Sequence, residues 1–177
     1  MHLPWRDVPV GVDPVRPILT SLTADESAEL ARLAAGRTVL EIGSAYGYST
    51  CVMGLAGAVR LISVDPHWPL ASAGALAENV DHFGLTGTVQ IRQATSQQVL
   101  PELFDAGQQV DMVFIDGEHL EAGVRFDLTW AERLLTPVGV LACHDYGEDC
   151  CCPDVRRVLD EMHPGKGKVT DTLWVRQ

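Results

Sequence analysis

The sequence predicts an α/β fold in which a mostly parallel central sheet carries helices on both faces. Short apolar runs of strand length alternate with longer amphipathic segments along the chain. Several of the apolar runs end in an acidic residue, which places polar groups at the carboxyl edge of the sheet, where ligands bind. A short stretch at residues 168–175 is expected to add an antiparallel C-terminal strand. The other strands are expected at residues 39–42, 58–64, 89–92, 110–115 and 138–143, and the helices at residues 24–35, 48–56, 70–83, 98–104, 120–135 and 155–162.

Capping residues mark the start and the end of the first helix. Thr23 and Glu26 have the spacing of a capping box, in which each side chain bonds the backbone of the other residue. Gly36 follows the last periodic residue and ends the helix. Four prolines precede this helix, so we expect residues 1–22 to form a proline-rich arm and residues 23–177 to form a single domain.

The composition fits a globular protein and excludes some partners. The chain has 177 residues, of which 46% are hydrophobic and 21% are charged, enough for a sizeable core. No apolar run reaches the ~20 residues of a membrane span, and the N-terminus lacks the apolar core of a signal peptide. We therefore expect a cytoplasmic protein without a membrane partner. The formal net charge of −11 argues against nucleic acid, whose phosphates require clustered Lys and Arg.

Five cysteines are present, and three of them are consecutive at residues 150–152. This pattern does not suit a disulfide framework and indicates reduced thiols. Adjacent cysteines do not easily reach one tetrahedral ion together, and the chain has no C-x-x-C pair, so the run does not favour zinc. Loop packing or contact with a substrate is the expected role.

The stretch VLEIGSAYGYST, residues 39–50, combines a strand, a glycine turn and a helix start. Such a unit binds nucleotides, because the helix amides point at the space above the glycines. The spacing here is G-x-x-x-G, between Gly43 and Gly47, and not the dinucleotide pattern G-x-G-x-x-G. Glu41 would repel a pyrophosphate but attract an ammonium group, which S-adenosylmethionine (SAM) carries. The residues expected to contact such a ligand here are Glu41, Gly43, Ser44, Gly47, Tyr48 and Ser49.

This stretch resembles motif I of class I SAM-dependent methyltransferases, and EIGSAYGYS is similar to the version in catechol- and caffeoyl-CoA-type O-methyltransferases. The resemblance implies a Rossmann-like class I methyltransferase fold. Asp65 ends the second strand about 20 residues after the turn, where an acid binds both ribose hydroxyls in SAM and NAD enzymes alike. The resemblance also implies that Thr95, Ser96 and Gln97 surround the adenine, although Thr and Ser at such a turn are also ordinary helix caps.

Asp116 and Asp145 end two strands that are neighbours in this topology, so their carboxylates are expected to meet. Two converging carboxylates need a proton or a cation between them, and Mg²⁺ is the usual cation. The resemblance implies a metal ligand at both positions, while the family's third ligand falls on Tyr146. His144 or Asp149 is the expected substitute. In the alternative interpretation Asp116 contacts SAM and Asp145 is a cap.

Methyl transfer from SAM requires an aligned nucleophile that loses its proton. By resemblance, His119 occupies the position of the catechol-type Lys base, and Glu118 that of the acid in sugar O-methyltransferases. An imidazole with its ordinary pKa near 6.5 accepts a proton at pH 7. We therefore predict His119 as the base and Glu118 as the second candidate. A solvated histidine at a helix start is the alternative.

The segments DGEH and HDY also resemble a broad methyltransferase family, with Val138 as a departure from its usual P-G-G. The predicted function is methyl transfer from SAM to a small-molecule acceptor, most simply at a hydroxyl oxygen. Three alternatives stay open: an NAD-dependent oxidoreductase, an idle SAM-binding or partner-binding module, and a protein or nucleic-acid methyltransferase. The acceptor is not identified, and its pocket must come from the arm, from residues 144–153, or from a second subunit of a homodimer.

Overall fold

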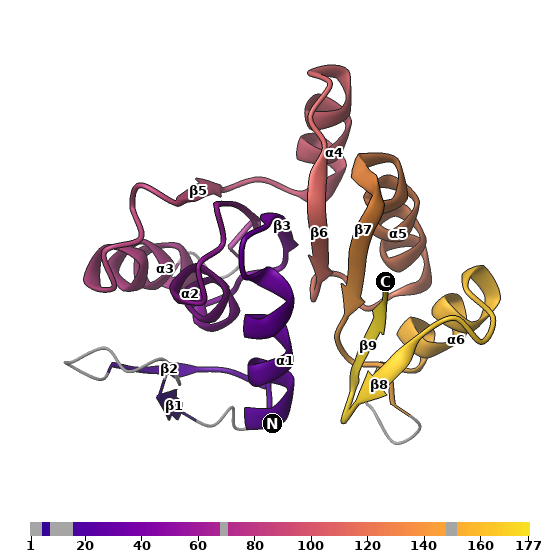
Figure 1. Cartoon of the computed structure of the whole chain (residues 1–177), viewed down its shortest axis with the longest axis horizontal. Helices are drawn as coiled ribbons and strands as arrows, with labels where there is room; N and C mark the ends of the chain where they lie inside the picture. The colour runs from indigo at the N-terminus through magenta and orange to yellow at the C-terminus, as the bar shows by residue number, and fades with distance from the viewer. Residues whose placement is uncertain (1–4, 8–15, 68–70, 148–151) are drawn as a thin grey trace.

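The computed structural model describes residues 5–7, 16–67, 71–147 and 152–177, and its main feature is a seven-stranded sheet (Figure 1). The strand order is β5-β4-β3-β6-β7-β9-β8, in which β3 to β7 run parallel and β9 is antiparallel to both β7 and β8. This confirms the predicted α/β fold with a mostly parallel sheet. The strands are β3 (Thr38–Ile42), β4 (Arg60–Val64), β5 (Val89–Arg92), β6 (Val110–Ile115), β7 (Leu135–Cys143), β8 (Lys168–Thr170) and β9 (Leu173–Arg176).

Helices cover both faces of the sheet because successive strand side chains point to opposite faces. Val39 lies in the core cluster that contains residues of α1, α2 and α3, whereas Leu40 lies in the cluster that contains residues of α4, α5 and α6. In Figure 1 the first three helices accordingly lie on one side of β6 and β7, and α5 and α6 lie on the other. The helices are α1 (Ala24–Ala34), α2 (Tyr48–Leu55), α3 (Ala71–His82), α4 (Ser96–Asp105), α5 (Glu121–Leu134) and α6 (Pro153–Met162).

The main differences from the sequence prediction lie near the two ends of the chain. The expected single C-terminal strand is a hairpin, because Thr170 pairs with Leu173 across a two-residue turn in which Asp171 has a positive φ of 51°. In the proline-rich arm, β1 (Trp5–Asp7) pairs with β2 (Pro17–Leu19), an antiparallel pair that the sequence did not predict. Strands of three residues are too short to show a periodicity.

The part of the arm next to α1 packs onto the domain. Ile18 and Leu22 are buried in the same core cluster as α1 and α2. The division at residue 22 stays a prediction, and residues 1–4 and 8–15 of the arm lie outside the described residues. Within the described parts of the chain, no helix combines the length and the apolar character needed to cross a membrane.

The glycine turn after β3 is pressed against the end of β6. Gly43 has a φ of +88°, and a Cβ atom there would lie 2.0 Å from the carbonyl oxygen of Asp116. The amide of Gly43 donates to Val64, and the amide of Asp116 donates to Ile42. Only glycine therefore fits at this position, and the turn is fixed against the residue that begins the second predicted site.

Replacing Gly43 by Ala should strongly destabilise the fold. The positive φ costs about 1–2 kcal/mol, and relieving the overlap with the Asp116 backbone costs about 1–3 kcal/mol more. We expect a loss of about 2–5 kcal/mol in the free energy of unfolding, measured in urea.

Gly36→Ala is the matched control. Gly36 also has a positive φ, of 73°, but a Cβ atom added there would meet no other atom within 4 Å, so only the backbone cost of about 1–2 kcal/mol applies. Equal losses in the two variants would show that the close approach to Asp116 does not matter.

Candidate functional site

A cavity of about 400 Å³ opens at the carboxyl ends of the parallel strands. Polar residues that follow three separate strands, β4, β5 and β6, converge on it beside the glycine turn after β3, as expected for a ligand site in an α/β sheet. The described residues in its wall are Ile42, Gly43, Ala45, Val64, Asp65, Pro66, Thr95, Ser96, Gln97, Asp116, Gly117, Glu118 and Asp127. Seven of the residues predicted from the sequence are among them: Gly43, Asp65, Thr95, Ser96, Gln97, Asp116 and Glu118.

A smaller hollow of about 80 Å³ lies on the other side of the glycine turn. Ser44, Tyr48 and Ser49 line it together with arm residues 19–22, and Gly43, Ala45 and Asp116 border both spaces. Gly47 is not among the described residues that line either space. Its added Cβ would lie 2.5 Å from the Leu76 side chain, so Gly47 is needed for the packing of α2 against α3.

Glu41 was predicted to contact a ligand's ammonium group, but the structure places it behind the cavity and not in its wall. Its side chain is completely buried, and its two oxygens accept hydrogen bonds of 2.5 Å from the hydroxyls of Ser49 and Thr50. Burial raises the pKa of Glu41 to about 7, against the opposing effect of these hydroxyls. The Glu41 carboxylate therefore stabilises the start of α2 through these two hydrogen bonds.

Asp65 faces the cavity and is held in place by backbone amides. Its Oδ2 accepts from the amides of Ser44 and Ala45 at 2.9 and 2.8 Å, and its Oδ1 accepts from the amide of His67 at 2.5 Å. The carboxylate is thus fixed between the glycine turn and the end of β4. Binding of ribose hydroxyls by Asp65 stays a prediction.

Thr95, Ser96 and Gln97 form the start of α4 and one wall of the cavity. Thr95 is the N-cap, and the side chain of Gln98 accepts a hydrogen bond of 3.1 Å from the Thr95 amide. Helix capping and contact with the cavity were alternatives in the sequence. The structure combines them, because Thr95 caps the helix while all three residues face the cavity.

Asp127 on α5 is a cavity residue that the sequence analysis missed. It is completely buried, and burial raises its pKa to about 6, with Ser96 opposing the shift. Neither carboxylate oxygen makes a hydrogen bond of good geometry to the described residues. An acid on the buried side of a helix, beside Val124 and Leu128, was the signal that could have identified it.

The two predicted metal-site acids meet, and two histidines lie between them. Nε2 of His119 is 2.8 Å from Asp145 Oδ2 and 3.9 Å from Asp116 Oδ1. Nδ1 of His144 is 3.3 Å from Asp116 Oδ1 and 3.5 Å from Asp145 Oδ1. One ligand atom from each of Asp116, His144 and Asp145 lies within 4.8 Å of the others, which is the set predicted from the sequence.

The acids hold both imidazoles in the charged form. Asp116 and Asp145 raise the pKa of His119 to about 10, against a smaller effect of burial. Burial disfavours a charged His144, but Asp116, Asp145 and Glu26 together raise its pKa to about 12. An imidazole with its ordinary pKa was expected at His119. That expectation is corrected, because nearby carboxylates keep His119 protonated at neutral pH in this arrangement.

Glu26 supports His144 from the side away from the cavity. Its Oε2 lies 3.3 Å from His144 Nε2, and its Oε1 accepts from the amide and the hydroxyl of Thr172 at 2.8 and 2.7 Å. The predicted capping box is confirmed, since Oε2 also accepts from the Thr23 amide at 2.8 Å. The sequence did not predict that the same carboxylate reaches a site histidine.

The remaining candidate site residues either make hydrogen bonds to nearby groups or lie outside the described residues. Glu118 accepts from the amides of His119 and Leu120 at 3.0 and 3.2 Å, at the start of α5. Tyr146, at the position of the family's third metal ligand, donates its hydroxyl to Asp160 Oδ1 at 2.7 Å. Asp149 lies outside the described residues.

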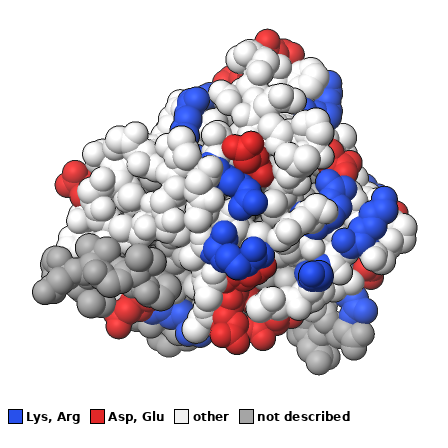
Figure 2. Space-filling model, viewed as in Figure 1, with Lys and Arg blue, Asp and Glu red and all other residues white. Residues whose placement is uncertain are grey.

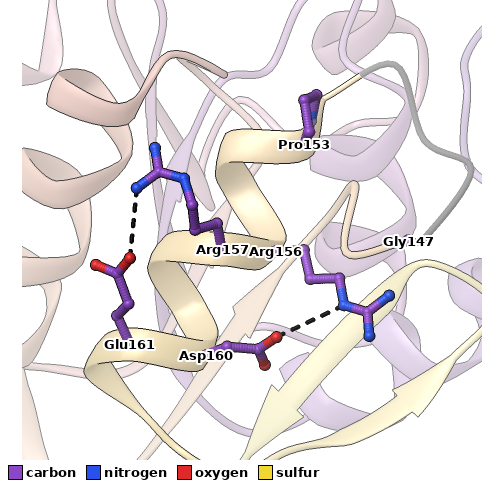
Figure 3. A pocket seen from close by; sticks show the side chains of 6 residues that line it. All are labelled: Gly147, Pro153, Arg156, Arg157, Asp160 and Glu161. Atoms are coloured by element: carbon purple, nitrogen blue, oxygen red, sulfur yellow. Dashed lines mark hydrogen bonds and ion pairs between the residues drawn. The ribbon is translucent and has the colours of Figure 1, made fainter.

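An open hollow of about 510 Å³ lies beside α6 and the end of the segment after β7 (Figure 3). Arg157 approaches Glu161, and Arg156 approaches Asp160, as the dashed lines in Figure 3 show. Each arginine in this hollow is therefore paired with an acid of the same helix. The hollow shares none of its described lining residues with the 400 Å³ cavity at the strand ends.

The sheet order, the glycine turn and the converging acids define the class of protein. A Rossmann-like parallel sheet with one antiparallel strand beside its last parallel strand, and a ligand cavity at the first glycine turn, is the arrangement of class I methyltransferases. The chain matches the family model described as "Methyltransferase domain" over residues 40–146, and it belongs to this family.

Known proteins agree with this assignment. A catechol O-methyltransferase from Niastella koreensis is 33% identical over 137 residues, which are 75% of this chain and 57% of that protein. The chain therefore spans little more than half the length of this relative.

Two solved structures share the fold. An O-methyltransferase from Bacillus cereus in complex with SAH has a TM-score of 0.71 and 18% identity, covering 88% of this chain and 80% of that chain. The O-methyltransferase TomG from Streptomyces achromogenes, in complex with SAM, has a TM-score of 0.70 and 24% identity, covering 88% of this chain and 79% of that chain.

Glu26→Gln tests the support of His144. Several hydrogen bonds together lower the pKa of Glu26 from 4.5 to about 2 against the effect of burial, which comes first in size. Its charge therefore stabilises the fold above pH 4.5, and this contribution is lost as the pH falls towards 2. We expect Glu26→Gln to lower the free energy of unfolding at pH 7 by roughly 3 kcal/mol and to flatten its decline between pH 4.5 and 2.

The measurement is urea unfolding at a series of pH values, with Glu29→Gln as the control on the same helix. Glu29 pairs with Arg32 at the surface, so its loss should change stability by less than about 1 kcal/mol. An unchanged acid profile in Glu26→Gln would show that the buried carboxylate does not contribute.

Proposed function

We propose that this protein transfers a methyl group from SAM to a hydroxyl oxygen of a small molecule. The observation that carries the proposal is the position of Asp116, which borders the large cavity, the smaller hollow and the acid–histidine cluster. A methyl donor in the cavity would therefore lie beside side chains that can accept or donate a proton. The catechol O-methyltransferase among its relatives supports an oxygen acceptor.

Each part of the cavity suits one part of SAM. We assign Asp65 to the ribose hydroxyls and Ser96 and Gln97 to the adenine. Asp127 lies in the same wall, and its carboxyl, which lacks a well-formed hydrogen bond to described residues, can accept one from the adenine amino group. Asp116 is assigned to the ammonium group, in place of the buried Glu41.

The smaller hollow suits the amino-acid end of SAM, because the polar residues Ser44, Tyr48 and Ser49 line it. Glu41 acts on this region through Ser49 and Thr50, whose hydroxyls it holds. We therefore treat Glu41 as a positioning residue.

Alternative functions have less support. An NAD-dependent oxidoreductase needs a pyrophosphate at the glycine turn, where the sequence lacks G-x-G-x-x-G. A nucleic-acid substrate needs a continuous basic surface. On the described part of the face in Figure 2, Lys and Arg are interspersed with Asp and Glu, and the net charge is −11.

The acid–histidine cluster fits a divalent cation. Asp116, His144 and Asp145 offer three ligand atoms within 4.8 Å of one another, and the buried Nδ1 of His144 lacks a well-formed hydrogen bond to described residues. When bound there, a cation such as Mg²⁺ would supply positive charge that stabilises an ionised acceptor hydroxyl. Asp116 and Asp145 would hold it, and Glu26 would keep the proton of His144 on Nε2.

The chain's own residues provide the proton transfer. Once an acceptor hydroxyl replaces Asp145 as the neighbour of His119 Nε2, the imidazole can take its proton while the methyl group is transferred. While Asp116 and Asp145 lie beside the imidazole, its pKa of about 10 keeps His119 mostly protonated at pH 7, so the neutral form that can act as a base is scarce. Turnover should therefore increase when a bound cation or ligand offsets the negative charge of Asp116 and Asp145, because the pKa of His119 then falls.

Asp65→Asn should weaken SAM binding by about 1–3 kcal/mol, or roughly 5–150-fold, because the ribose hydroxyls lose a charged acceptor. Calorimetry with SAM and SAH measures the change, and NAD is the competing ligand. Asp81→Asn, an exposed acid on α3, is the control and should bind normally. Binding of NAD in place of SAM by the unmodified protein would contradict the proposed function.

His119→Gln should lower turnover about 10²–10⁴-fold, the usual range for a general base. Catechol is the first acceptor to use, because a relative carries its name. In the unmodified protein, turnover without added metal should keep rising as the pH approaches 10, because the deprotonated imidazole becomes more abundant. His119→Gln should lose this rise while its affinity for SAM stays within about 1 kcal/mol.

Glu118→Gln is the paired comparison for the base. A large loss of turnover in Glu118→Gln with a small loss in His119→Gln would assign the base to Glu118.

Removal of divalent cations with EDTA tests whether turnover needs a metal. Full turnover in EDTA would leave a transferase that works without a metal.

A further inference from the structure

A second cluster of possible metal ligands lies beside the predicted one and shares only Asp145 with it. His119, Asp145 and Cys152 each offer one ligand atom, and these atoms all lie within 4.8 Å of one another. The three residues come from separate segments: His119 precedes α5, Asp145 follows β7, and Cys152 is the N-cap of α6. The fold therefore brings together an imidazole, a carboxylate and a thiol.

The three side chains lie close enough together to share one ion. Nε2 of His119 is buried and lies 2.8 Å from Asp145 Oδ2, yet it makes no hydrogen bond of good geometry to the described residues. Cys152 is buried, with only 9% of its residue surface exposed. A buried nitrogen in this position can turn its lone pair towards a cation between the three groups.

The chemistry of this set differs from that of a magnesium site. Mg²⁺ prefers six oxygen ligands, whereas a thiolate, an imidazole and a carboxylate together suit Zn²⁺ and similar metals. Tyr146 does not provide an oxygen ligand, because its hydroxyl donates a hydrogen bond to Asp160. The imidazole nitrogen of His119 and the sulfur of Cys152 stand where Mg²⁺ would need further oxygen ligands.

We propose that His119, Asp145 and Cys152 form a site for a divalent transition metal of the zinc class, with three protein ligands and an open fourth position. Adjacent cysteines do not easily bind one ion together, but this site needs only one of them, because His119 and Asp145 provide the other two ligands of the metal that Cys152 binds.

This site goes beyond the proposed methyl transfer and does not depend on it. Metal binding here needs neither SAM nor an acceptor. While His119 is a metal ligand, its imidazole cannot accept a proton, so the zinc-bound state and the general-base state of His119 exclude each other. The site shares Asp145 with the Asp116–His144–Asp145 set, so the two sets cannot both be filled independently.

The test is the binding of Zn²⁺ and Co²⁺ to the full chain without SAM. Calorimetry should show one strong Zn²⁺ site per chain that excess Mg²⁺ does not displace. The Co²⁺ form should show a thiolate-to-cobalt charge-transfer absorption band. Cys152→Ser should abolish this band and weaken Zn²⁺ binding at least about tenfold, since even the loss of an indirect contact to a metal ligand costs about 10–100-fold. His119→Ala should weaken Zn²⁺ binding to a similar degree.

Cys150→Ser and Cys151→Ser are the matched controls, and both should retain the band and the affinity. Loss of the band in either of them but not in Cys152→Ser would overturn the assignment to Cys152. A Co²⁺ spectrum without a thiolate band in the unmodified protein, or displacement of Zn²⁺ by Mg²⁺, would overturn the proposal itself. SAM affinity in Cys152→Ser, measured in parallel, should be unchanged. Failure of all variants to bind SAM would count against the proposed function and not against the metal site.

Discussion

Two carboxylates at the ends of adjacent strands are held close together, and most features of the site follow from the repulsion between them. His119 and His144 lie beside Asp116 and Asp145 as cations, and their positive charge offsets this repulsion. Positive charge from the histidines keeps the pKa of Asp145 well below its usual range, although burial acts in the opposite direction. A third carboxylate, on Glu26, secures His144. A ligand or metal that binds here must therefore take the place of a histidine cation or change the balance between the carboxylates and the histidines.

The architecture could be predicted from local features of the sequence. Apolar runs followed by an acid locate the ends of β4 and β6, and the capping box of Thr23 and Glu26 starts α1 at the expected residue. These signals are local because each strand or helix is specified by its own residues and caps. The pairing of β1 with β2 was missed, since its three-residue strands depend on contact with each other.

The site was predictable only as far as strand ends determine it. Asp65, Ser96 and Asp116 border the cavity as the sequence indicated, because the carboxyl ends of parallel strands lie at one edge. The pKa of His119 was not predictable, since it depends on the distance between side chains that follow two different strands. The position of Glu41 below the turn was missed for a similar reason, because residues of α2 cover it. Cys152 joins the cluster only through the placement of α6.

The bonds between Glu26 and Thr172 connect residues 146 positions apart. The pairing among β3 to β7 does not involve residues 168–177, whereas His144 and Glu26 share Thr172 as a neighbour. All described residues in the wall of the 400 Å³ cavity precede residue 128. The acid–histidine cluster therefore depends on the C-terminal strands for its support, while the wall of the cavity draws no described residue from them.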